Sequence, residues 1–166
     1  MVMKLGSPEL MARRHQVDDF DCGDAQLNDW LRQRALARQL GRRRCTYVVS
    51  DDEGLVRGYY TLSAGGVSFA VNSVKSRRSM PDPVPVMVLV RLAIDQEARD
   101  EDLAVSLLKD AVTRVDALAQ HAGVRAMLVN ALDDGARKFY ERHGFQPSPS
   151  IPEVLTLQVP TSVKSV

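Results

Sequence analysis

The sequence of 166 residues contains only two cysteines, Cys22 and Cys45. They share no metal-type spacing, and neither has a histidine or another cysteine close to it in the chain. A structural zinc site or a disulfide framework would need such partners. We therefore expect two ordinary reduced thiols and no bound metal.

Long apolar segments are lacking as well. The longest run without a charged residue, Gly58 to Val74, is slightly short for a membrane span and is broken by glycines and serines. The N-terminal region has no apolar signal core, so we expect a cytoplasmic protein. There is no internal repeat, low-complexity tract or evident linker, and 45% hydrophobic and 26% charged residues are typical of a globular protein. These features predict a single domain over residues 1–166.

The net charge of +1 is small, but the charges are segregated along the chain. Six arginines and no acid lie between Arg32 and Arg44, and a second basic group follows at residues 75–78. Residues 95–102, in contrast, are rich in acids. This segregation indicates partners of different charge for different parts of the protein.

The first half of the chain predicts one helix and a hairpin. Asp24 can cap a helix, because apolar residues follow at helical spacing from Leu27 to Leu36. Strands over 46–49 and 55–62 flank an acidic turn at 51–54 that ends in glycine, which is typical of a β-hairpin. We expect Gly65 and Gly66 to end or bulge the second strand. Residues 67–74 suit a further strand and residues 75–83 an exposed loop.

The second half alternates strands and helices. Nearly every residue from Val84 to Ile94 is apolar, which predicts a central strand covered on both faces. An apolar stripe from Leu103 to Leu118 predicts a long helix, closed by Gly123. We expect a strand over 124–132, a short helix over 136–143 capped by Asp133, and a last strand over 154–159. This order predicts a mixed α/β (α+β) fold.

Several short motifs occur in a fixed order between Phe20 and Leu157. They are Phe20-Asp21-Cys22-Gly23 with Leu27 and Trp30-Leu31, Gly58-Tyr59-Tyr60-Thr61-Leu62-Ser63, Pro83-Val84-Pro85-Val86, Arg91-Leu92-Ala93, and Ala136 with Phe139-Tyr140 and Gly144-Phe145. By these motifs the sequence resembles the GNAT N-acetyltransferase toxins of type II toxin-antitoxin modules. The resemblance implies a mostly antiparallel central sheet that is flanked by helices and opens between two strands to admit acetyl-CoA. It also implies acetylation of the amino group of aminoacyl-tRNA, which blocks translation, with a ribbon-helix-helix antitoxin and a homodimer as expected partners.

The same resemblance implies the residues of an acetyl-CoA site. Tyr140 is expected to give a proton to the departing thiolate of coenzyme A, although Phe139 and Tyr140 taken alone would suit core packing on a short helix. Strand residues would offer backbone groups to the pantetheine arm, and the start of the next helix would offer N–H groups to the pyrophosphate. Asn130 is a mild departure, because related toxins often carry His at that position. The implied cofactor-binding residues are Leu92, Ala93, Ile94, Arg99, Asp100, Asp102, Leu103, Ala104, Asn130 and Phe139.

The pyrophosphate loop departs further from the family pattern, which is Gln/Arg-x-x-Gly-x-Gly/Ala with an additional Gly after the first residue. Arg99 and Ala104 fit, but Asp102 replaces the central glycine and Asp100 the additional one. An aspartate adds a Cβ where the backbone must approach phosphate, and two like charges about 4 Å apart repel by roughly 4 kcal/mol at an effective dielectric near 20. A net penalty of about 2.7 kcal/mol would weaken binding about a hundredfold. The loop therefore predicts weakened or lost acetyl-CoA binding. Alternatively, the acids interact favourably with the helix dipole and turn to solvent, and binding is retained.

Two functions are consistent with these features. In an active toxin, arginines would contact tRNA phosphates without reading base sequence, although a solvated helix face would explain the same residues. In a degenerate GNAT-fold protein, no acetylation would occur and the protein would act by binding its antitoxin or another regulator. Tyr140 favours the first function and the acidic loop the second. The arginines in question are Arg34, Arg38, Arg42, Arg43, Arg44, Arg77 and Arg78.

Overall fold

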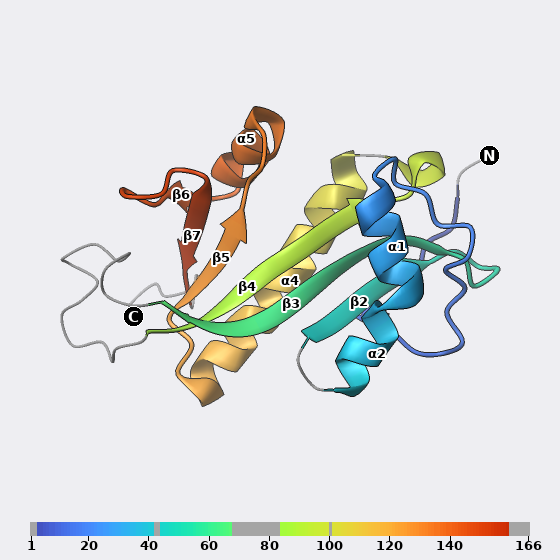
Figure 1. Cartoon of the computed structure of the whole chain (residues 1–166), viewed down its shortest axis with the longest axis horizontal. Coiled ribbons are helices and arrows are strands. Elements are labelled where there is room, and N and C mark those ends of the chain that lie inside the picture. Colours follow the sequence, from blue (N-terminus) through green and yellow to red (C-terminus); the bar gives the residue numbers. More distant parts are fainter. Residues whose placement is uncertain (1–2, 42–43, 68–83, 100, 160–166) are drawn as a thin grey trace. The chain divides into compact units, whose positions relative to one another are not determined.

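The computed structural model describes residues 3–41, 44–67, 84–99 and 101–159 (Figure 1). The chain divides into a first unit, residues 1–63 and 90–111, and a second unit, residues 64–89 and 112–166. Strands β3 (Val56–Val67) and β4 (Val84–Ile94) and helix α4 (Glu101–Ala122) contribute residues to both units. No helix in the described part of the chain is long and apolar enough to cross a membrane.

Within the described residues, seven strands are hydrogen-bonded in the order β1-β2-β3-β4-β5-β7-β6. Strand β4 pairs in parallel with β5, while the β1-β2, β2-β3, β5-β7 and β6-β7 pairs are antiparallel. The sequence-based prediction of a mixed fold with a mostly antiparallel sheet is therefore confirmed. The remaining strands are β1 (Glu9–Leu10), β2 (Arg44–Ser50), β5 (Ala126–Asn130), β6 (Gln146–Pro147) and β7 (Val154–Gln158).

Two short helices stand where the sequence predicts one. They are α1 (Ala25–Gln33) and α2 (Ala35–Leu40). Asp24 caps α1 as predicted, because its Oδ1 accepts hydrogen bonds from the backbone N–H of Gln26 at 2.9 Å and of Leu27 at 3.4 Å. The prediction of a continuous helix is wrong at Arg34, whose φ of −125° and ψ of −26° interrupt the helical conformation. Apolar spacing alone does not reveal such a break.

The predicted hairpin joins β2 to β3. Gly54 adopts a φ of 86°, which a glycine tolerates without strain, and Asp51 Oδ1 accepts hydrogen bonds from the N–H of Glu53 and Leu55. Gly65 and Gly66 do not end the second strand, since β3 continues to Val67, and the alternative of a bulge at these glycines stays a prediction. Pairing with neighbouring strands overrides the low strand propensity of glycine. The strand and loop expected over 67–74 and 75–83 lie mostly outside the described residues.

Aromatic rings form the core of the first unit. Tyr59 packs against Phe20 at a centroid distance of 5.5 Å and is stacked with Trp30 at 6.1 Å. The Tyr59 hydroxyl donates a hydrogen bond to the carbonyl oxygen of Leu27 at 2.8 Å, which joins β3 to α1. A Cβ at Gly58 would lie 3.1 Å from Cδ1 of Leu107, so the absence of a side chain there lets α4 approach β3 closely.

The second unit contains the end of α4, strand β5 and helix α5 (Asp134–Arg142). As predicted, Asp133 caps α5 by accepting a hydrogen bond from the N–H of Ala136 at 2.7 Å. Gly123, with a φ of 72°, follows the end of α4 as expected. The strand predicted over 124–132 is shorter, and Leu132 is exposed rather than buried.

Candidate functional site

A cavity of about 430 Å³ lies in the first unit beside the end of β4. Its lining comes from the turn before α1 and the first turn of that helix, from the last residues of β4, and from the loop and first turn of α4. Most of this lining is apolar, with one cation and one carboxylate. The lining residues are Cys22, Asp24, Leu27, Leu92, Ala93, Ile94, Arg99 and Ala104.

Five of these residues are among those that the sequence predicts for the cofactor. Leu92, Ala93 and Ile94 are consecutive residues of β4, and Arg99 and Ala104 lie on either side of the α4 N-terminus. The structure thus brings the predicted pantetheine strand and part of the predicted pyrophosphate loop to one cavity. Their role in binding a cofactor stays a prediction.

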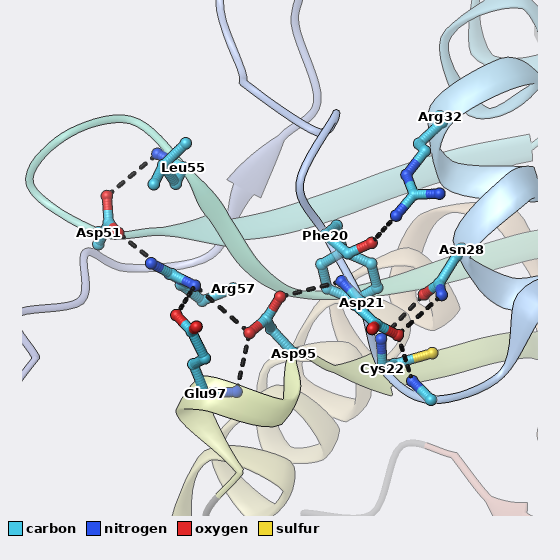
Figure 2. A network of polar contacts seen from close by, with 11 residues as sticks. Phe20, Asp21, Cys22, Asn28, Arg32, Asp51, Leu55, Arg57, Asp95 and Glu97 are labelled. Atoms are coloured by element: carbon cyan, nitrogen blue, oxygen red, sulfur yellow. Dashed lines mark hydrogen bonds and ion pairs between the residues drawn. The ribbon is translucent and has the colours of Figure 1, made fainter.

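A buried carboxylate at the end of β4 holds the turn before α1 in place. Asp95 is 3% exposed, and its Oδ2 accepts a hydrogen bond from the N–H of Asp21 at 3.0 Å (Figure 2). Its Oδ1 accepts a hydrogen bond from the N–H of Glu97 at 2.9 Å, which starts the short 3-10 helix Gln96–Ala98. The Asp21 carbonyl oxygen in turn accepts a hydrogen bond from the N–H of Gln96 at 2.8 Å. These contacts join the turn that carries Cys22 to the loop that carries Arg99, and both residues line the cavity.

Arg57 of β3 neutralises the acids around this junction. Its guanidinium lies 3.0 Å from Asp51, 3.3 Å from Asp95 and 3.1 Å from Glu97, as Figure 2 shows. Burial alone would lower the pKa of Arg57, but the hydrogen bond that Arg57 donates to Asp51 and the charge of Asp95 raise it overall. Burial would likewise raise the pKa of Asp51, yet hydrogen bonds from Leu55 and Arg57 hold it below its ordinary value. The group is therefore a charged, mutually satisfied network at neutral pH.

Helix α1 fixes the same turn from its other side. Asn28 is buried; its Oδ1 accepts a hydrogen bond from the N–H of Cys22 at 2.9 Å, and its Nδ2 donates to Asp21 at 3.1 Å. Arg32 donates a hydrogen bond to the carbonyl oxygen of Phe20 (Figure 2). The thiol of Cys22 is buried, and burial raises its pKa, so it is neutral at pH 7. This turn is a rigid wall of the cavity.

Arg99 connects the α4 loop to that wall. Its Nη2 donates a hydrogen bond to the carbonyl oxygen of Cys22 at 2.7 Å. The residue is exposed, so further N–H groups of the guanidinium face solvent and can bind an anion.

The acids of the α4 loop are described only in part. Asp100 lies outside the described residues, and Asp102 is an exposed residue in the first turn of α4. An exposed carboxylate is screened by water and salt, which weakens its repulsion of a nearby anion. Whether these acids weaken acetyl-CoA binding stays a prediction. Leu103 is partly buried and approaches Gly58 of β3 rather than lining the cavity.

Tyr140 lies in the second unit, on α5. It is buried at 8% exposure between the rings of Phe139 and Phe145, at centroid distances of 5.2 and 5.5 Å. Burial raises the pKa of Tyr140 to about 12. Its hydroxyl makes no hydrogen bond within the described part of the chain. Phe139 is partly buried, and Asn130 is exposed at the end of β5.

Three of the predicted nucleic-acid-binding arginines can be placed. Arg34 is exposed immediately before α2, and Arg38 is exposed within α2. Arg44 is partly buried at the start of β2. Arg42, Arg43, Arg77 and Arg78 lie outside the described residues.

Sequence reasoning missed three residues of the cavity lining and the carboxylate that organises it. Cys22, Asp24 and Leu27 line the cavity, and Asp95 positions the turn that carries Cys22. The Phe20-Asp21-Cys22-Gly23 motif was a usable signal, because a motif that precedes a capped helix indicates a turn of fixed shape. Nothing local in the sequence indicates that this turn meets a segment more than seventy residues away.

The residues present fit the pantetheine arm and the pyrophosphate of acetyl-CoA. The cavity volume lies in the range of small-molecule sites, and its apolar lining suits an uncharged pantetheine arm. Arg99 places a cation with free donors at the loop where a pyrophosphate is expected. Asp102 is the one described residue of this loop whose charge opposes such an anion.

Comparison with known proteins agrees with this geometry. The family described as the acetyltransferase (GNAT) domain matches residues 42–147. A tRNA-acetylating toxin of Mycobacterium tuberculosis is 41% identical over 152 residues, which cover 91% of this chain and 90% of the toxin. The chain therefore belongs to the GNAT acetyltransferase family, as its motifs predict. Within this family it is similar to tRNA-acetylating toxins.

Solved structures show the same fold. AtaT in complex with acetyl-methionyl-tRNAfMet has a TM-score of 0.85 at 25% identity, covering 93% of this chain and 95% of that one. A mutant of the toxin AtaT, bound to the C-terminus of the antitoxin AtaR and acetyl-CoA, has a TM-score of 0.78 at 23% identity, covering 93% of each chain.

Proposed function

We propose that this protein is the toxin of a type II toxin-antitoxin module and that it acetylates the amino group of aminoacyl-tRNA. The observation that carries the proposal is the 41% identity to a tRNA-acetylating toxin over 91% of this chain. The cavity at the end of β4 supports it, because five residues expected to bind the cofactor line one space of suitable size.

In this proposal, acetyl-CoA supplies an acetyl group activated as a thioester. Backbone groups of Leu92, Ala93 and Ile94 hold the pantetheine arm, and the free donors of Arg99 bind the pyrophosphate. Ala104 leaves room for the cofactor beside the first turn of α4. Asp102 weakens this binding without abolishing it, because an exposed carboxylate in the first turn of a helix is largely screened. Asp100 would add repulsion of the same sign. The resemblance also assigns Phe139 and Asn130 to cofactor binding. Leu103, which approaches Gly58 and does not line the cavity, would contribute only by packing the first turn of α4.

Tyr140 serves as the proton donor. With a pKa of about 12, its phenol is fully protonated at neutral pH. Donation to a free thiolate with a pKa near 8.5 would be uphill by about 5 kcal/mol, at 1.36 kcal/mol per pKa unit. The proton must therefore move while the carbon-sulfur bond breaks, as in general acid catalysis, and the amine that gains the acetyl group releases a proton in exchange.

The partners follow from the same proposal. The acceptor is an aminoacyl-tRNA, whose phosphates are contacted by the exposed arginines Arg34 and Arg38 together with other basic residues. A ribbon-helix-helix antitoxin neutralises the toxin, which acts as a homodimer in the cytoplasm, where translation takes place. The solved AtaT complex with the C-terminus of its antitoxin supports a partner of this kind.

Expression in a bacterial host tests the proposal. The wild-type protein should stop growth and block cell-free translation, and a Tyr140→Phe variant that folds normally should do neither. If the Tyr140→Phe variant is equally toxic, the protein acts by binding, as the degenerate alternative holds, and the proposal is wrong.

A further inference from the structure

Helix α5 ends in a motif that includes the backbone of Tyr140. Gly144 adopts a φ of 96°, in the left-handed region that favours glycine, and its N–H donates a hydrogen bond to the carbonyl oxygen of Glu141 at 3.2 Å. The N–H of Phe145 donates a hydrogen bond to the carbonyl oxygen of Tyr140 at 3.1 Å. These are the two hydrogen bonds of a Schellman motif. The end of α5 therefore fixes the backbone of Tyr140.

The same motif brings aromatic side chains together. In a Schellman motif, the side chain after the glycine often packs on the residue whose carbonyl oxygen its N–H binds. Phe145 is 2% exposed, and its ring lies edge-to-face on the Tyr140 ring with the centroids 5.5 Å apart. Phe139 makes a second edge-to-face contact with Tyr140 at 5.2 Å. The phenol ring is thus held between two aromatic rings of the second unit.

These ring contacts decide where the Tyr140 hydroxyl points. The hydroxyl makes no hydrogen bond within the described part of the chain, so no polar contact orients it there. A proton donor must lie about 2.6 to 3.2 Å from the atom that it protonates. A displacement of about 1 Å can lower the rate about a hundredfold. Transfer from Tyr140 therefore depends on the residues that hold its ring in place.

His143 completes this arrangement with its side chain. Its Nδ1 lies 2.7 Å from the carbonyl oxygen of Phe139, and because a carbonyl oxygen only accepts, Nδ1 carries the proton. Its ring packs on the Phe139 ring at a centroid distance of 5.0 Å. Its backbone N–H donates a hydrogen bond to the carbonyl oxygen of Tyr140 at 3.0 Å. His143 therefore contacts both the backbone and the ring of Phe139, which in turn contacts Tyr140.

We propose that His143, Gly144 and Phe145, which we call the α5 cap, hold the phenol of Tyr140 in position for proton donation, with His143 as a positioning residue. This inference rests on the proposed function, in which Tyr140 is the proton donor. It assigns a role to Gly144-Phe145, one of the motifs by which the sequence resembles the family. The α5 cap acts through Phe139 and Tyr140 and needs no contact between His143 and a substrate.

Steady-state acetyl transfer by variants of His143 tests the proposal. His143→Ala removes the donor and the ring, and it should lower kcat between about tenfold and a hundredfold while the KM for acetyl-CoA stays unchanged. His143→Asn should keep most of the wild-type kcat, because the Nδ2 of asparagine can take the place of the histidine Nδ1. His121→Ala, at an exposed histidine in the last turn of α4, is the matched control and should change neither constant.

Titration of Tyr140 gives a readout that does not depend on acetyl transfer. Tyrosinate absorbance of each variant, minus that of the same variant with Tyr140→Phe, reports the ionisation of this phenol alone. Burial raises the pKa of Tyr140 to about 12, and a ring that leaves its place becomes hydrated. The midpoint should fall toward about 10 in His143→Ala and stay near that of wild type in His143→Asn and His121→Ala. If His143→Ala does not fold, His143→Leu, which has no donor, replaces it in both measurements.

Three results would overturn the inference. In the first, His143→Ala has the kcat and the Tyr140 midpoint of wild type. In the second, His143→Ala raises the KM for acetyl-CoA and leaves kcat unchanged, which would place His143 in cofactor binding. In the third, His143→Ala and His143→Asn lose kcat equally with the midpoint unchanged, which would make the imidazole part of the chemistry. Full transfer by Tyr140→Phe, with a lowered midpoint in His143→Ala, would instead overturn the proposed function and leave the contacts of the α5 cap confirmed.

Discussion

Arg99 donates a hydrogen bond from Nη2 to the backbone carbonyl oxygen of Cys22 at 2.7 Å. This contact joins the loop that precedes α4 to the turn that precedes α1, and both segments line the cavity. The guanidinium has further donors in solvent, so one side chain can fix the loop and present charge to an anion. Arg99 is therefore the best single probe of cofactor binding.

Replacing Arg99 by alanine should weaken acetyl-CoA binding about tenfold. Hydrogen bonds to charged groups contribute about 1.5 to 3 kcal/mol, and 1.4 kcal/mol corresponds to a factor of ten. Calorimetric titration measures the change, with Arg38→Ala on the exposed face of α2 as a control of equal charge. Equal affinities in Arg99→Ala and wild type would show that the loop does not bind the cofactor.

Removing the acids of the loop should strengthen acetyl-CoA binding. Asp100→Gly with Asp102→Gly should raise the affinity, at most about a hundredfold, and the gain should shrink at high salt because screening already weakens the repulsion. Asp102→Asn separates the two causes, since it removes the charge and keeps the Cβ. Asp52→Asn, in the exposed hairpin turn, is the matched control and should have no effect. An affinity unchanged by these substitutions would mean that the acids face solvent and do not oppose binding.

Tyr140→Phe should abolish acetyl transfer and leave the fold intact. The hydroxyl has no hydrogen-bond partner in the described part of the chain, so its loss should change the free energy of unfolding by less than about 1 kcal/mol. Thermal unfolding and an acetyl-transfer assay measure the two effects. A variant that still transfers acetyl groups at the wild-type rate would exclude Tyr140 as the proton donor.

The phenol of Tyr140 should also ionise at unusually high pH. Its pKa in the folded protein is about 12, above the value near 10 of an unfolded chain. The contribution of Tyr140 to stability is therefore complete below pH 10 and is lost as the pH rises toward 12. Tyrosinate absorbance of the wild type minus that of Tyr140→Phe reports this ionisation directly. A midpoint near pH 10 would contradict the burial that the account assigns to this side chain.

Arg57→Gln should destabilise the protein by about 3 to 5 kcal/mol at neutral pH. The side chains of Asp51 and Asp95 are 7% and 4% exposed, and this substitution leaves both carboxylates without their cation. Because the pKa of Asp51 is lowered in the folded protein, its stabilising effect is present above the ordinary carboxyl range and is lost as the pH falls below about 4. Denaturant unfolding at several pH values should therefore show the difference from wild type shrinking in acid.

A surface ion pair provides the control for the Arg57 experiment. Arg14 and Glu9 are 2.7 Å apart, but their side chains are 66% and 47% exposed. Arg14→Gln should leave the free energy of unfolding nearly unchanged, because solvent screens an exposed ion pair. If Arg57→Gln costs no more than this, the network around Asp95 does not hold the cavity wall in place.

Much of the fold follows from local sequence patterns. The apolar run Val84–Ile94 coincides with β4, and the aspartates at 24 and 133 cap helices as predicted. These features are encoded by neighbouring residues, and sequence reasoning reaches them. The break at Arg34 and the continuation of β3 past Gly65 to Val67 are not encoded by neighbouring residues, so local propensity does not predict them.

In the candidate site, too, local sequence patterns predict some residues and miss those that distant segments bring together. Leu92, Ala93, Ile94, Arg99 and Ala104 lie close together in the sequence and were predicted as a group. Cys22, Asp24 and Leu27 reach the cavity only through the contact between two distant segments that Asp95 and Arg99 make.

Direct transfer of an acetyl group from labelled acetyl-CoA to aminoacyl-tRNA tests the central claim most closely. With the wild-type protein, label should appear on the amino group of the tRNA-bound amino acid, and with Tyr140→Phe none should appear. The double variant Asp100→Gly with Asp102→Gly should need less acetyl-CoA for the same transfer. Absence of labelled tRNA with wild-type protein at saturating acetyl-CoA, and also with the glycine-restored variant, would contradict this claim.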